Sequence, residues 1–356
     1  MPDLTKTIQC ISGLDHKFME EAQQRLDSLT KPLGSLGRLE ELAKQIVGIT
    51  GKMNPELKNK VIFTLAGDHG VTEEGVSAYP KEVTAQMVYN FLRGGAGINV
   101  LAKHIGAKVI VVDMGVAEDL KIDNSLKQNF INRKIAYGTK NMAVGAAMER
   151  EEAIKAIEAG IEIFEGEYRN KVDIIGTGEM GIGNTASASA ITAVLTNNTP
   201  DTLTGRGAGL DDKGLENKIR IIKKSISVNK PDPRDPIDVL SKIGGFEICG
   251  LVGIILAAAS KKVPVVIDGF ISGSAALSAF HLAPKVKDYM ISSHVSVEKG
   301  HRIILDHIGL EPLFDLDLRL GEGTGAALGI SLADAAIKIL TQMATFKSAG
   351  VSEKNT

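Results

Sequence analysis

Six short apolar runs, each followed at once by a loop of glycine and polar residues, recur along most of this 356-residue chain. The segments between most of these runs are long enough to form helices. Apolar strands that alternate with helices predict a doubly wound α/β fold, with a mostly parallel, Rossmann-like sheet covered by helices on both faces. The predicted strands are residues 61–66, 108–112, 172–175, 263–267, 289–292 and 313–320.

The loops after these runs predict where a ligand binds. In doubly wound sheets, ligands bind outside the carboxyl ends of the strands. All six loops follow predicted strands, so we expect them to share one rim of the sheet. They begin at Gly67, Asp113, Gly176, Asp268, Ser293 and Gly321.

The two ends of the chain have a helical pattern. Phe18, Ala22, Leu26 and Leu29 fall on one face of a predicted helix, with Asp15 as its N-cap. A long apolar helix is predicted from residue 326 to about residue 343. The turn-rich stretch at residues 229–236 is interpreted as a loop inside the large domain, because strand signals continue on both sides of it.

Composition excludes several classes of function. A net charge of −2, with 4% aromatic residues and no Trp, argues against a nucleic-acid-binding protein. Two distant cysteines and no Cys/His cluster predict neither a disulfide framework nor a zinc site. The apolar run at residues 248–259 is too short to cross a membrane, and the first residues lack a signal-peptide core, so we expect a cytoplasmic protein.

Two glycine-rich loops suggest contacts with a phosphate. Gly176, Gly178 and Gly181 satisfy the GxGxxG pattern, with Asp201 twenty residues further on, which suggests NAD binding. Asp201 does not follow a predicted strand, however, and amides at a helix N-terminus bind a mononucleotide equally well. In the second loop, at residues 204–212, Arg206 and a later Lys218 could complement a phosphate, although a turn with a capping aspartate explains the pattern as well.

Glu322 is the most unusual acidic residue, since glycines flank it between a predicted strand and a predicted helix. A partly desolvated carboxylate in such a loop has a raised pKa and can act as a general base. The alternative is that it only stabilises the start of the helix. Glu179 lies in a comparable loop and could complete a pair of carboxylates. Asp68, His69 and His294 are interpreted as structural residues, so no metal site is predicted.

Long motifs then indicate a family. The chain resembles the nicotinate-nucleotide–dimethylbenzimidazole phosphoribosyltransferases from about residue 25 to residue 351. The matching segments include Lys31-Pro-Leu-Gly-Ser-Leu-Gly-Arg-Leu-Glu, Gly67-Asp-His-Gly-Val, Glu74-Gly-Val-Ser-Ala-Tyr-Pro, Gly178-Glu-Met-Gly-Ile-Gly-Asn-Thr, Thr204-Gly-Arg-Gly-Ala-Gly-Leu-Asp-Asp, Ser293-His-Val-Ser-Val-Glu-Lys-Gly-His and Leu318-Arg-Leu-Gly-Glu-Gly-Thr-Gly.

The resemblance implies transfer of 5-phosphoribosyl from nicotinate mononucleotide to 5,6-dimethylbenzimidazole in cobalamin biosynthesis, without a cofactor or metal. It implies that Glu322 is the general base. It places Tyr79, Gln86 and Leu320 around the aromatic acceptor, and Glu179, Gly181, Gly207, Lys218 and Ser296 around the ribose phosphate and nicotinate. The chain departs from part of the family at Ala78, where some members carry a hydroxyl near the acceptor.

The resemblance also implies a homodimer. Each subunit would have a small helical domain formed by residues 1–56 and 335–356, and a large catalytic domain formed by residues 57–334. Two other functions fit some of the residues: an NAD-dependent dehydrogenase, based on the glycines from Gly176 to Gly181, and a non-catalytic sensor of a mononucleotide. A sensor would gain little from a general base beside its ligand.

Overall fold

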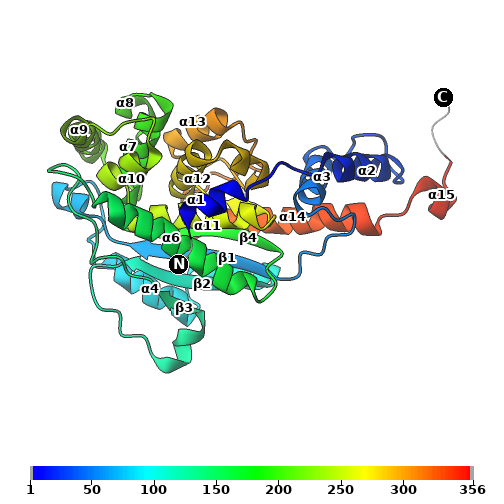
Figure 1. Ribbon diagram of the computed structural model, residues 1–356, viewed down its shortest axis with the longest axis horizontal. Helices are drawn as coiled ribbons and strands as arrows, with labels where there is room; N and C mark the ends of the chain where they lie inside the picture. The colour runs from blue at the N-terminus through cyan, green and yellow to red at the C-terminus, as the bar shows by residue number, and fades with distance from the viewer. Residues whose placement is uncertain (1–2, 353–356) are drawn as a thin grey trace.

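A six-stranded, entirely parallel sheet forms the centre of the protein, and its order is β3-β2-β1-β4-β5-β6. Figure 1 labels β3, β2, β1 and β4 in this order. The computed structural model describes residues 3–352. The parallel sheet, with a core on each of its faces, confirms the predicted doubly wound fold. The strands are β1 (Lys60–Gly67), β2 (Ala107–Gly115), β3 (Phe130–Asn132), β4 (Ile174–Met180), β5 (Val265–Ile267) and β6 (Met290–Ser292).

Strand β1 shows why the sheet is covered on both faces, since its side chains alternate between two cores. Phe63 and Leu65 belong to the core on one face. Ile62 and Ala66 belong to the core on the other face. A strand that is buried on both sides has a continuous apolar sequence, which is why residues 61–66 could be recognised from their composition.

Helices form a layer on each face. On the first face, α7–α10 and α13 pack beyond α12, on the side shown at the upper left of Figure 1. This face comprises α1 (Leu4–Gln9), α6 (Arg150–Tyr168), α7 (Asn184–Thr196), α8 (Pro200–Leu203), α9 (Asp212–Asn229), α10 (Pro236–Ile243), α11 (Phe246–Ser260), α12 (Phe270–Leu282) and α13 (Lys299–Ile308). The second face carries α2 (His16–Asp27), α3 (Arg38–Thr50), α4 (Val83–Arg93), α5 (Gly97–Ile105) and α14 (Thr324–Gln342).

Four short helices complete the chain. They are the 3-10 helices η1 (Gly70–Glu74), η2 (Asn124–Asn129) and η3 (Pro284–Tyr289), and the terminal α15 (Phe346–Ala349). The predicted loop at residues 229–236 is confirmed, because it separates α9 from α10 within the same layer. The predicted N-cap is confirmed as well, since the Asp15 carboxylate accepts a hydrogen bond from Phe18 N.

One predicted strand is wrong. Residues 313–320 form no strand of the sheet, and their only bridge joins Phe314 to His294. The segment cannot continue as a regular strand because Asp317 adopts a φ of 53°, which turns the backbone out of the extended region. The sixth strand is β3 instead, three residues whose sequence Phe-Ile-Asn carries too little pattern to be recognised.

The two ends of the chain meet along α14. Helices α2 and α3 lie against its far half, at the right of Figure 1, and Leu29 forms a β-bridge with Thr345. Helix α1, in contrast, packs against α11 on the opposite face of the sheet. The division into domains at residues 56/57 and 334/335 stays a prediction.

Helix α14 is long and apolar enough to cross a membrane, judged by length and composition only. More than half of its most apolar window is buried inside the protein. The core helices of other proteins share these properties, so they give weak evidence for a membrane span.

Candidate active site

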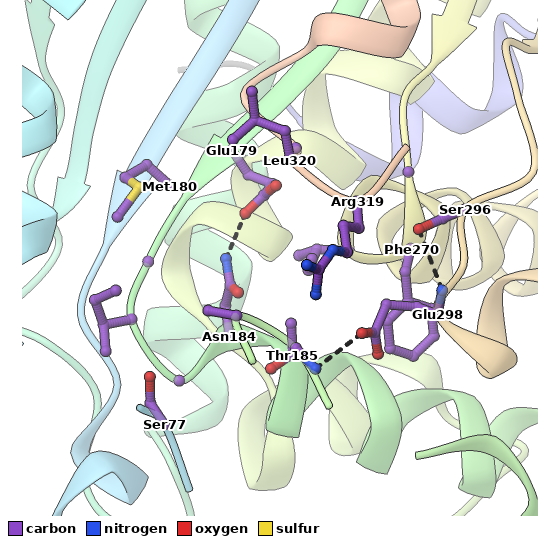
Figure 2. Close-up of a pocket in the computed structure, with 18 of the residues that line it drawn as sticks. Ser77, Glu179, Met180, Asn184, Thr185, Phe270, Ser296, Glu298, Arg319 and Leu320 are labelled. Atoms are coloured by element: carbon purple, nitrogen blue, oxygen red, sulfur yellow. Dashed lines mark hydrogen bonds between the residues drawn. The ribbon is translucent and has the colours of Figure 1, made fainter. Parts of the chain in front are cut away.

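A pocket opens where the order of the strands reverses, between β1 and β4. Doubly wound sheets bind their ligands at this position. The pocket has a volume of about 150 Å³ and is lined by residues that follow β1, β4, β5 and β6. Figure 2 shows Glu179 and Asn184 on one side of it, with Ser296 and Glu298 on the other.

The structure brings five of the nine predicted site residues to this pocket. Glu179, Gly181, Gly207, Ser296 and Leu320 all line it. Glu322 lies two residues beyond Leu320 and is buried beside the lining. Lys218 is fully buried behind the pocket, and Tyr79 and Gln86 are exposed side chains that are not part of its lining.

Glu322 lies in a strained loop, and not at the end of a strand as predicted. Its φ is 63°, and the flanking Gly321 and Gly323 have φ values of 81° and 101°. A non-glycine residue in this conformation costs of the order of 1–3 kcal/mol and persists only where its surroundings hold it. Gly321, Glu322 and Gly323 are thus three consecutive residues in the left-handed region. The two glycines adopt it without strain, whereas Glu322 adopts it at a cost in backbone conformational energy.

Asp268, directly after β5, holds this loop in place. One oxygen of its carboxylate accepts hydrogen bonds from Gly325 N (2.7 Å) and Ala326 N (3.1 Å). The other oxygen accepts one from Gly323 N (3.0 Å). Burial raises the pKa of Asp268 to about 7, although the backbone N–H groups act in the opposite direction. This one carboxylate thus caps α14 and fixes the backbone on both sides of Thr324.

The side chain of Glu322 points at the start of another helix. Its Oε2 accepts a hydrogen bond from Ile98 N (3.1 Å), in the first turn of α5. The alternative interpretation placed Glu322 at the start of the helix that follows it, whereas its carboxylate contacts the first turn of α5 instead. Burial raises its pKa, and the N–H groups of Ile98 and Gly97 offset part of that rise because they stabilise the charged form.

The glycines of the GxGxxG pattern serve packing in this structure and do not form the phosphate-binding turn of an NAD site. Gly176 and Gly178 lie inside β4, and not in a turn between a strand and a helix. A Cβ on Gly178 would come within 2.3 Å of the Glu322 carbonyl oxygen. The glycine therefore lets the Glu322 loop pack directly on the sheet. Because a dinucleotide fold needs its first glycine in the tight turn after the strand, the structure does not favour a dehydrogenase.

Glu179 is the second carboxylate of the site, as its position in the sequence suggested. It lies at the end of β4 and accepts a hydrogen bond from the Asn184 amide, in the first turn of α7 (Figure 2). Burial, and then repulsion from Asp268, raises the pKa of Glu179 to about 8. Glu179 is therefore protonated at neutral pH and can donate a hydrogen bond to a ligand.

The two cations associated with the second glycine loop, Arg206 and Lys218, both have partners within the protein. Lys218 Nζ donates to Thr185 Oγ1 (2.8 Å) and to the Gly205 carbonyl oxygen (3.3 Å), so it supports a lining residue from behind. Arg206 forms an ion pair with Asp212. Gly207 N, a predicted binding group, donates to Glu298 Oε1 (2.8 Å).

His69 and Glu247 form a buried ionic pair outside the pocket lining. His69 Nε2 and Glu247 Oε1 are 2.7 Å apart, and His69 Nδ1 is 3.1 Å from Ser187 Oγ. Burial would lower the pKa of His69, but the Glu247 carboxylate more than offsets this and raises it. His294 instead lies 3.0 Å from Ser293 Oγ and, through burial, has a pKa lowered to about 4. Between residues 3 and 352, no group of three or more His, Cys, Asp or Glu side chains could hold a metal ion.

Two residues of the site were missed in the sequence. Asp268 could have been found by the argument used for the other loops, because it is a carboxylate directly after a predicted strand. Arg319 had no such signal. Its guanidinium lies among the lining side chains (Figure 2) and is not paired with a carboxylate of any described residue.

Comparisons with known proteins show the family of this chain. A family model described as "Phosphoribosyltransferase" matches residues 11–351. The nicotinate-nucleotide–dimethylbenzimidazole phosphoribosyltransferase of Desulforudis audaxviator is 56% identical over 353 residues, which are 99% of each chain. The protein of the same name from Geobacter sulfurreducens is 55% identical over 98% of each chain.

Two solved structures have a closely similar fold. The crystal structure of CobT from Thermus thermophilus superimposes with a TM-score of 0.90 at 42% identity, over 95% of this chain and 100% of that one. A second structure of the enzyme from the same organism gives a TM-score of 0.89 at 41% identity, over 96% of this chain and 100% of that one. The chain belongs to the nicotinate-nucleotide–dimethylbenzimidazole phosphoribosyltransferase family.

Proposed function

We propose that the protein transfers the 5-phosphoribosyl group of nicotinate mononucleotide to 5,6-dimethylbenzimidazole, a step in cobalamin biosynthesis. A nitrogen of the benzimidazole attacks C1′ of the ribose, and the bond from C1′ to the pyridine nitrogen breaks. The bonding electrons return to nicotinate, and the anomeric centre inverts from β to α. The products are nicotinate and α-ribazole 5′-phosphate.

The observation that carries this proposal is the carboxylate of Glu322, held at the rim of the pocket in a strained glycine loop. A neutral benzimidazole must lose its N–H proton as its other nitrogen becomes glycosylated, so the reaction needs a base. Glu179 suits this role poorly, because a pKa of about 8 leaves it protonated at neutral pH. Burial also raises the pKa of Glu322, but the N–H groups at the start of α5 offset part of that rise because they stabilise its charged form.

We place the mononucleotide in the pocket between Glu179 and Ser296. The N-terminus of α7 and the guanidinium of Arg319 both favour an anion there. Lys218 supports the phosphate region through Thr185, at 2.8 Å, and is a positioning residue. The protonated Glu179 is suited to donate a hydrogen bond to an oxygen of the ribose.

We place the acceptor on the outer side of Leu320, next to Glu322. Leu320 and Tyr79 expose 59% and 53% of their surfaces, which is unusual for large apolar side chains and suits a flat aromatic ligand. Gln86, an exposed side chain on α4, is our candidate for a polar contact with the acceptor. In this arrangement the acceptor reaches C1′ from one side, while nicotinate leaves into the pocket.

The direct test is incubation of the protein with nicotinate mononucleotide and 5,6-dimethylbenzimidazole, with release of nicotinate and formation of α-ribazole 5′-phosphate followed by chromatography. Turnover that depends on both substrates supports the proposal. Tight binding of the mononucleotide without turnover would instead indicate the sensor. A series of acceptor bases, compared by kcat/KM, would then define the preferred one.

We further propose that the protein acts in the cytoplasm as a homodimer, without a cofactor. The exposed Leu33, Tyr79 and Leu320 are large apolar side chains that a partner subunit or a ligand could cover. Light scattering after size-exclusion chromatography distinguishes a 37.8 kDa monomer from a particle of twice that mass.

A further inference from the structure

Two histidines lie edge to edge on the surface, away from the pocket. His281 is in the last turn of α12, and His307 is in the last turn of the neighbouring α13. Their Nε2 atoms are 3.1 Å apart, while the ring centroids are 5.2 Å apart and the ring planes differ by 14°. Because the nitrogens are closer together than the centroids, the two rings meet through their Nε2 edges.

Phe280 holds this arrangement. Its ring meets both imidazoles edge to face, with centroids 6.0 Å from His281 and 6.3 Å from His307. Two Nε2 atoms at hydrogen-bond distance have room for one proton between them, so the pair cannot be doubly protonated in this geometry.

We propose that His281 and His307 form a binding site for a divalent transition-metal ion such as Zn²⁺, which fastens the end of α12 to the end of α13. Zinc binds imidazole nitrogens at about 2.0–2.1 Å, so two ligands at 90–110° around the ion lie roughly 2.9–3.4 Å apart. The observed 3.1 Å falls within that range. Water completes the coordination, since the described residues offer no third His, Cys, Asp or Glu side chain there.

This site lies far from the chemistry but on elements that line the pocket. Helix α12 begins at Phe270, and the N-cap of α13 is Glu298; both residues line the pocket. His281 lies eleven residues after Phe270, or about 16 Å along the helix. A bound ion would therefore take no part in the reaction, and would act by holding two pocket-forming helices together at their opposite ends.

The test is titration of metal-free protein with ZnCl₂ by calorimetry, at neutral pH in a buffer that does not chelate. The variants are His281→Ala, His307→Ala and the double variant, and the matched control is exposed His16→Ala, in the first turn of α2. We expect one site in the wild type and in the control. Each single substitution should weaken it at least tenfold, since loss of even an outer-shell group typically costs 10–100-fold. The double variant should bind little more weakly than either single variant, because a single imidazole cannot chelate.

Thermal melting gives a second readout. Zn²⁺ should raise the melting temperature of the wild type and of His16→Ala, and should leave the two single variants unchanged. Melting of each metal-free variant shows that it is folded, and His307→Gln repeats the test with a polar side chain in place. Zinc binding or zinc stabilisation that survives loss of either histidine would overturn the proposal.

Discussion

Replacement of Glu322 by Gln should abolish most catalysis while leaving the fold intact. Gln has nearly the same size, and its amide oxygen can still accept the Ile98 N–H that lies 3.1 Å from the carboxylate. The loss of the charge at the start of α5 costs about 0.3–1 kcal/mol. Removal of the burial cost of that charge, which is what raises the pKa of Glu322, acts in the opposite direction. We therefore expect a change in the free energy of unfolding of less than about 1 kcal/mol.

The effect on the rate should be much larger, because an amide has no basic lone pair to accept the benzimidazole proton. General-base catalysis typically contributes 10²–10⁴-fold, so kcat should fall by about that factor. This corresponds to about 2.7–5.5 kcal/mol in the activation barrier. The affinity for nicotinate mononucleotide should stay nearly the same, since its proposed contacts come from other loops.

The assay is single-turnover release of nicotinate, measured beside a thermal melt of each protein. The matched control is Asp317→Asn, the same chemical change at an exposed residue that also has a positive φ and lies outside the pocket. The control should turn over like the wild type. If Glu322→Gln melts normally and stays within about threefold of the wild-type rate, Glu322 is not the base, and Glu179 should be tested next.

Three further predictions concern Asp268, the phosphate of the substrate and Glu179. Asp268→Asn should lower both kcat and the melting temperature, because an amide oxygen cannot accept all three N–H groups that the carboxylate holds; each such bond to a charged group contributes about 1.5–3 kcal/mol. Nicotinate riboside, which lacks the phosphate, should bind about 1.5–3 kcal/mol more weakly than the mononucleotide in a calorimetric titration, and equal affinities would contradict the proposed anion site. Burial raises the pKa of Glu179 from 4.5 to about 8, so the folded state retains a proton that the unfolded chain releases; this contribution to stability is complete below pH 4.5 and is lost as the pH rises through 8. Melts across that range should therefore show a flatter pH dependence for Glu179→Gln than for the wild type.

Most of the fold could be predicted because the strands of a sheet buried on both faces have a distinctive composition. Five of the six predicted strands overlap strands of the structure. The exception, residues 313–320, shows the limit of this signal, since an apolar run with alternating aspartates resembles a strand until one residue turns into a positive φ. Strand β3 carries only three residues at the edge of the sheet, where little burial constrains the sequence.

The residues of the site were predictable where they follow a strand, and less so where partners decide their role. Glu179 and Gly181 follow from their position at the end of a strand. The role of Lys218 depends on Thr185 and Gly205, which no spacing in the sequence connects to it. Similarly, the composition of its loop did not indicate that Arg206 pairs with Asp212.

Helix α14 connects the Glu322 loop to the packed chain ends formed by α2 and α3. It begins two residues after Glu322 and ends beside Arg25, whose guanidinium donates to the Met343 carbonyl oxygen at 2.8 Å. Its 19 residues span about 28 Å, so a tilt of only about 3° around its C-terminal end would displace its N-terminal end, beside Glu322, by roughly 1.5 Å. A misplacement of about 1 Å at a reacting group can reduce a rate by about a hundredfold. The packing of the two chain ends against the C-terminal end of α14 thus influences the position of the Glu322 carboxylate near its N-terminal end. Substitutions among the packed chain ends can therefore slow the reaction although they contact no ligand.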